Sequence, residues 1–275
     1  MLQARETVAS LLGAADPDPV EVVNPGGLSD VLLVCEHAGR AVPSALRGLG
    51  VAAEEMERHI AYDIGAGGLA RKLAQALDAT LVLQRYSRLV IDCNRPLEAV
   101  DCTPESSDGT AIPANCDLPE PDRRMRFEAI HRPFHDAIGA VLDERKLKGR
   151  PAVIATIHSF TPRLANSERP WHLGVCFNCD GTFARKFMHA FKATRPELVA
   201  AFNEPYTVDD ISDYTIPVHG ERRGLPHVLL EVRNNEIRDE EGQGRWARLL
   251  AHALSTASRP TAGELSHGAC DADES

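Results

Sequence analysis

Two histidines and a glutamate stand at the ends of apolar runs long enough to form strands. His37 follows the run VLLVC and the adjacent Glu36, His158 ends AVIATIH, and Glu231 lies in HVLLEV. Imidazoles and a carboxylate bind Zn²⁺ well, and a catalytic zinc site keeps one position open for water. Zinc lowers the pKa of that water to ~7, and a further carboxylate then serves as general base. These residue types therefore indicate metal-assisted attack on a carbonyl.

Two acids, Glu36 and Asp63, are alternative candidates for the third metal ligand. Glu36 is adjacent to His37, and neighbouring residues on a strand face opposite ways. Asp63, in AYDIGAGGLARKL, precedes a predicted helix. Aspartate is also a favoured N-cap at that place, so a purely structural role is an equal alternative for it.

Such side chains need a sheet whose strands end at one edge. Apolar runs of strand length cover residues 31–35, 80–84, 89–93, 152–157, 173–177 and 227–232. Most are continuously apolar, which is typical of strands buried on both faces, so we predict a largely parallel sheet. Ligands bind beyond the carboxyl ends of the strands in such sheets.

Helical patterns lie between these runs. Apolar residues recur at helical spacing within residues 69–77, 130–142, 183–191 and 246–254. The alternation predicts one α/β domain, residues 1–257, followed by a disordered tail, residues 258–275. The segment of residues 98–122 is too long to be a simple connection between two elements, so we predict that it is a binding loop or lid.

Charge and composition exclude several classes of partner. The chain has 40 acids against 30 bases, a formal net charge of −10, which disfavours nucleic acid and anionic membranes. No apolar stretch approaches membrane-spanning length, and the first residues make a poor signal peptide, so we expect a cytoplasmic protein. A serine hydrolase is poorly supported because the chain has no GxSxG motif.

Motifs over most of the chain, taken in order, resemble the N-formylglutamate amidohydrolase family. They are CEHAG, AYDIGAGGLARKL, YSRLVIDCNRP, HRPFH, IHSFTP and YTIPVHGERRGLPHVLLEVRN. The resemblance implies a three-layer α/β/α sandwich with a largely parallel or mixed sheet, similar to zinc carboxypeptidases, and one divalent metal ion, zinc by preference.

The same resemblance implies roles for four residues. His37, Asp63 and His158 would be the metal ligands, and Glu231 would be the catalytic carboxylate. Best-known members have proline where this chain has Glu36, so Glu36 is not expected to be a required ligand.

Arginines near the predicted strand ends suit an anionic substrate, because a guanidinium pairs with a carboxylate through two hydrogen bonds. The predicted substrate-binding residues are Arg85, Arg88, Asn94, Arg95 and Arg233. The alternative for the arginines is that they lie at the surface or form structural ion pairs. His219, on a glycine-flanked loop, would stabilise the carbonyl oxyanion or only pack the loop. His131 and His135 have helical spacing suited to a metal, but Pro133 between them favours a structural role.

These observations predict a metal-dependent amidohydrolase that removes a formyl or other acyl group from an acidic amino acid such as N-formylglutamate. One rival is a metallopeptidase or cell-wall amidase with a larger substrate, and another is a ligand-binding relative without turnover. The acidic chain and the long loop favour a small enclosed substrate. The presence of all four metal and base residues argues against a protein that only binds.

Overall fold

A mixed sheet of seven strands forms the centre of the computed structural model, which describes residues 11–259. The strand order is β1-β3-β2-β6-β11-β9-β10. The strands are β1 (Val20–Val23), β2 (Val31–Cys35), β3 (Thr80–Gln84), β6 (Val153–Phe160), β9 (Leu173–Cys176), β10 (Ala200–Phe202) and β11 (His227–Arg233). The four central strands β3, β2, β6 and β11 are parallel, β1 is antiparallel to β3, and β9 is antiparallel to β11 and parallel to β10.

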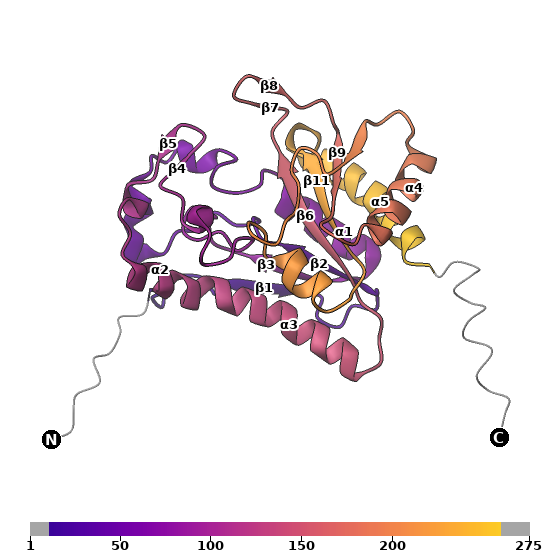
Figure 1. Cartoon of the computed structure of the whole chain (residues 1–275), viewed down its shortest axis with the longest axis horizontal. Helices are drawn as coiled ribbons and strands as arrows, with labels where there is room; N and C mark the ends of the chain where they lie inside the picture. The colour runs from indigo at the N-terminus through magenta and orange to yellow at the C-terminus, as the bar shows by residue number, and fades with distance from the viewer. Residues whose placement is uncertain (1–10, 260–275) are drawn as a thin grey trace.

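Helices cover both faces of this sheet, so the protein is an α/β sandwich (Figure 1). On one face lie α1 (Ala66–Leu77), α4 (Thr182–Thr194) and α5 (Glu240–Ala257). On the other lies α3 (Arg132–Leu147), which continues a short helix α2 (Glu120–Arg126) through a π-helical turn, Phe127–His131. None of the helices among residues 11–259 is both long and apolar enough to span a membrane.

The continuously apolar strands follow from this layering. Along β2, Leu33 packs into the core under α1 and α5, whereas Leu32 and Val34 pack into the core under α3. Both faces of the strand therefore need apolar side chains, and the predicted alternation of strands and helices in an α/β fold is confirmed.

One predicted strand is wrong. Residues 89–93 form a buried loop, in which the amide of Val90 donates to the carbonyl of Ser87 and the amide of Asp92 donates to the carbonyl of Cys102. Leu89, Val90 and Ile91 join the core under α3, so the run is apolar because it is buried and not because it pairs with a strand.

Two strands of the sheet were not predicted. They are β1 and β10, the strands at the two edges, and both are short and only partly buried. Edge strands lack the continuous apolar run that identifies a central strand. The predicted tail lies outside the described residues from residue 260 onward.

The parallel register brings three chemical groups into one row. Val34 of β2 is paired with Thr156 of β6, so the residues two positions further along, Glu36 and His158, come opposite one another. Glu231 of β11 is paired directly with His158 on the other side. Strand ends that are far apart in the sequence therefore meet at one edge of the sheet.

Gly174 on β9 allows the segment after β10 to lie against the sheet. A Cβ atom at this position would lie 1.9 Å from the carbonyl oxygen of Glu204 and 3.1 Å from the Cβ of Glu231. Because the first of these neighbours is backbone, no side-chain rotation relieves the overlap.

We therefore expect Gly174→Ala to lower the free energy of unfolding by about 1–3 kcal/mol, the usual cost of overpacking a core. Gly26→Ala is the matched control, since a Cβ there meets nothing within 4 Å. Urea unfolding of both variants measures the difference, and equal stability would contradict the close packing at Gly174.

Candidate metal centre and active site

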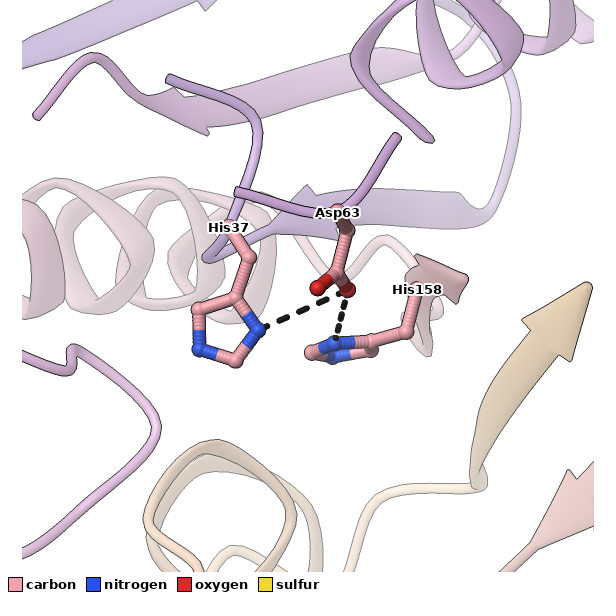
Figure 2. Close-up of side chains that lie close together, drawn as sticks. All are labelled: His37, Asp63 and His158. Atoms are coloured by element: carbon pink, nitrogen blue, oxygen red, sulfur yellow. Dashed lines mark hydrogen bonds and ion pairs between the residues drawn. The ribbon is translucent and has the colours of Figure 1, made fainter. Parts of the chain in front are cut away.

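His37, Asp63 and His158 form a buried group of three potential metal ligands (Figure 2). Asp63 Oδ2 lies 3.1 Å from His158 Nδ1 and 3.5 Å from His37 Nδ1. One nitrogen or oxygen atom from each residue lies within 4.8 Å of those of the other two. Three residues that are far apart in the chain thus present two nitrogens and one oxygen to a single point.

Asp63 does not cap the helix that follows it. The N-cap of α1 is Gly65, which has a φ of 82° and makes no side-chain capping bond. The carboxylate of Asp63 instead accepts a hydrogen bond from the backbone amide of Ser159, 3.1 Å away, and faces the two histidines. Glu36 is not a member of the group, and its Oε2 lies 3.1 Å from His158 Nε2, on the far side of that ring.

The donor atoms fit a divalent transition metal. Two imidazoles and a carboxylate are ligands that zinc accepts with a fourth position left for water or substrate. Nδ1 of His37 is buried and has no hydrogen-bond partner among residues 11–259, although it points at Asp63. A buried nitrogen without a partner is costly, and a bound cation at this point would satisfy it.

A second carboxylate, that of Asp92, contacts the ring nitrogen of His37 that faces away from Asp63. Asp92 Oδ1 lies 2.7 Å from His37 Nε2, and its Oδ2 accepts two hydrogen bonds from Arg88, from Nη2 at 2.7 Å and from Nε at 3.0 Å. Burial alone would raise the pKa of Asp92, but Arg88 and His37 hold it well below its ordinary value. Sequence analysis assigned no role to Asp92, which lies in the run, residues 89–93, that was predicted to be a strand.

Glu231 is a buried carboxylate that forms no ion pair with a lysine, arginine or histidine among residues 11–259. Its Oε2 has no hydrogen-bond partner among the described residues, and burial raises its pKa to about 7. Arg233, two residues further along the same strand, contacts Glu236 and Asn235. Glu231 therefore has the properties of a proton acceptor that works near neutral pH.

These groups line one cavity of about 480 Å³. His37, Asp63, His158 and Glu231 form part of its wall, together with the predicted substrate-binding residues Arg88, Asn94 and Arg95. Another part of the wall comes from residues 203–213, a segment that sequence reasoning missed because it follows the unpredicted edge strand β10. The predicted binding loop, residues 98–122, contributes no residue to this wall.

Three of the predicted site residues do not line the cavity. Arg85 pairs with Glu21 at 3.4 Å, and Arg233 pairs with Glu236. His219 lies outside the cavity wall, with its Nε2 3.1 Å from His135 Nδ1.

His135 and His219 form part of a stack of rings at the start of α3. His135 Nε2 donates to the carbonyl of Cys93, so its Nδ1 accepts from the Nε2–H of His219. Burial lowers the pKa of His135 well below its ordinary value and that of His219 to about 4, which keeps both rings neutral. These contacts agree with the structural role that the sequence favoured for His131 and His135, and they place His219 in the same stack.

The model of the N-formylglutamate amidohydrolase family matches residues 29–238. The chain belongs to this family. The family is one of hydrolases that act on amide bonds, and the resemblance of the sequence motifs is confirmed.

Two solved structures are similar over almost the whole chain. Gene product Atu2144 from Agrobacterium tumefaciens has 37% sequence identity over 90% of this chain and 97% of its own, with a TM-score of 0.86. N-formylglutamate amidohydrolase from Ralstonia eutropha JMP134 has 18% identity over 88% of this chain and 97% of its own, with a TM-score of 0.62, which shows the shared fold. No curated protein sequence matches the chain.

The raised pKa of Glu231 predicts a pH-dependent stability of the metal-free protein. Burial raises this pKa from 4.5 to about 7, so the folded state holds the proton more tightly than the unfolded chain does. The resulting stability is fully present below the unfolded pKa and is lost as the pH rises through the folded one. Glu231→Gln does not titrate at this position, and between about pH 5 and about pH 8 wild type should lose about 2–3 kcal/mol of stability relative to it.

Urea unfolding of both metal-free proteins at the two pH values measures this change. A stability difference that stays constant with pH would show that Glu231 does not hold a proton in the folded state.

Proposed function

We propose that this amidohydrolase is metal-dependent and removes the formyl group from N-formylglutamate or a closely related N-acyl acidic amino acid. The observation that supports it is the combination of a His–Asp–His group and an unpaired buried carboxylate, Glu231, in the wall of one cavity. A divalent ion held by His37, Asp63 and His158 would supply Lewis acidity to the amide carbonyl and to water.

Glu231 is the proton carrier in this proposal. Its carboxylate accepts a proton from the attacking water and delivers it to the leaving nitrogen, so one residue serves both steps. A pKa of about 7 suits both directions of transfer near neutral pH. Glu231 and the three candidate ligands are buried, which strengthens the electrostatic interactions between them.

Arg95 is the residue that we propose to bind the substrate carboxylate. Its Nε donates to Asp101 and its Nη1 to the carbonyl of Ser212 and, at 3.3 Å, to Asp213 Oδ1, while Nη2 makes no hydrogen bond to another described residue. Arg88 also lines the cavity, but all three of its nitrogens already donate to Asp63 or Asp92. Arg88 therefore has less capacity for a further anion than Arg95 has.

Replacing Glu231 by glutamine should leave a folded, metal-loaded protein with a kcat lower by at least ~10², the lower end of what general acid–base catalysis contributes. Glutamine keeps the shape of the side chain but cannot accept the proton. Zinc content, thermal melting and kcat are measured on one preparation. Wild-type kcat together with a lowered melting point would remove Glu231 from the mechanism.

Substrate preference tests the second part of the proposal. We expect N-formylglutamate to be hydrolysed faster than N-formylleucine, and Arg95→Ala mainly to raise KM, because its ion pair is present in ground and transition states alike. Arg85→Ala is the control, since Arg85 pairs with Glu21 and does not line the cavity. Equal turnover of the two substrates by wild type would contradict the preference.

A metallopeptidase or cell-wall amidase activity is the alternative with a larger substrate. A cavity of about 480 Å³ is in the range of small-molecule sites and favours a single N-acyl amino acid. Hydrolysis of an N-acyl peptide faster than of N-formylglutamate would favour the alternative.

A further inference from the structure

Glu36 is a charged side chain in a place where charge is costly. Its relative exposure is 0%, the same as that of the apolar residues of β2 that precede it. No lysine or arginine among residues 11–259 pairs with it, and its one ion-pair contact is with His158. A buried carboxylate needs a compensating partner, so a specific task must explain why an acid occupies this position.

His158 lies between two carboxylates. Its Nδ1 is 3.1 Å from Asp63 Oδ2, within the candidate metal group, and its Nε2 is 3.1 Å from Glu36 Oε2. A neutral imidazole that offers Nδ1 to a cation must hold its proton on Nε2. The carboxylate of Glu36 faces Nε2 and can accept a hydrogen bond from that proton.

His37 has the same arrangement. Its Nδ1 faces Asp63, and its Nε2 lies 2.7 Å from Asp92 Oδ1. Each histidine of the group therefore turns one nitrogen towards the shared point and the other towards its own carboxylate. A carboxylate behind a histidine ligand fixes the tautomer and orientation of the ring and raises its basicity.

The sheet register brings Glu36 close to His158. Val34 of β2 is paired with Thr156 of β6, and Glu36, the first residue after β2, and His158 each follow two positions later. The contact still has poor hydrogen-bond geometry, because neither Glu36 oxygen nor His158 Nε2 has a well-aligned partner among residues 11–259. The two atoms nevertheless lie 3.1 Å apart, within the distance range of a hydrogen bond.

We propose that Glu36 is a positioning residue for the metal ligand His158. Its carboxylate accepts the Nε2–H of His158, selects that tautomer and aims Nδ1 at the metal point beside Asp63. The inference rests on the proposed metal and assigns no part of the reaction to Glu36 itself.

Zinc affinity measures this role without any use of turnover. Zinc is titrated against a chelating dye for wild type, Glu36→Ala and Glu36→Gln. We expect Glu36→Ala to bind zinc ~10–100-fold more weakly, the usual cost of removing such a partner. Glu36→Gln should lose about fivefold, because its amide oxygen still accepts the proton but without charge assistance.

Glu221→Gln is the matched control. Glu221 also faces a buried histidine, His227, with 3.6 Å between its Oε1 and His227 Nε2, but neither residue lines the cavity. Its variant should bind zinc as wild type does, even if it is less stable. Glu221 is partly buried, so its variant tests the loss of a carboxylate beside a buried histidine. If such a loss weakened zinc binding in this variant too, that result would contradict the proposal.

A spectroscopic readout separates positioning from simple packing. In zinc-loaded protein labelled with ¹⁵N-histidine, the His158 Nε2–H should give a slowly exchanging proton signal that Glu36→Ala loses. If Glu36→Ala fails to fold, Glu36→Gln decides, and unchanged zinc affinity with an unchanged His158 signal would overturn the proposal. If wild type itself binds no zinc, the metal of the proposed function falls together with this inference, whereas zinc binding that is indifferent to Glu36 refutes the inference alone.

Discussion

Charge balance around the two histidines is the constraint on which the site depends. Four buried carboxylates, those of Glu36, Asp63, Asp92 and Glu231, converge there, and one arginine, Arg88, pairs with two of them. In the absence of a metal this excess is met by protons. Burial works against the charged form of His158, yet Glu36 and Asp63 raise its pKa well above the ordinary value.

A divalent cation bound between His37, Asp63 and His158 would replace those protons. It would neutralise the neighbouring acids and allow both histidines to be neutral ligands. The same excess of negative charge that disfavours a metal-free folded state thus favours cation binding. Glu231 is the fourth of these acids, and its burial raises its pKa to about 7.

The fold supplies the geometry through three neighbouring strands. The parallel pairings of β2, β6 and β11 place Glu36, His158 and Glu231 in one row, with an acid on either side of the histidine. The turns after β2 and before α1 then add His37 and Asp63 from the same edge. Residues 203–213 form another part of the wall, and the missing side chain of Gly174 leaves room for the carbonyl of Glu204 in that segment.

Much of this arrangement could be predicted from the sequence, because buried parallel strands have a distinctive pattern. The runs that became β2, β6 and β11 are continuously apolar, and a polar group at the end of such a run is conspicuous. Asp63 could not be distinguished from a helix cap by its sequence context, and only the family resemblance selected it. The structure adds the observation that Gly65 occupies the N-cap position.

The contacts behind the histidines could not be predicted. Asp92 lies in an apolar run that folds as a buried loop, and the loop reaches His37 through the core under α3 and not through strand pairing. The partners of the arginines are equally non-local: Arg85 meets Glu21 of the edge strand, which has no strong sequence signal. Such contacts depend on how segments that are distant in the sequence pack together, so no local sequence pattern predicts them.

The most direct measurement of the central claim is anomalous X-ray scattering at the zinc edge from a crystal of the zinc-loaded protein. The account predicts one anomalous peak per chain, at bonding distance from His37 Nδ1, Asp63 and His158 Nδ1 and within the cavity that Glu231 lines. A zinc peak bound by other residues would contradict this assignment. The absence of a peak at this site, together with full activity of the enzyme after chelation, would also contradict it.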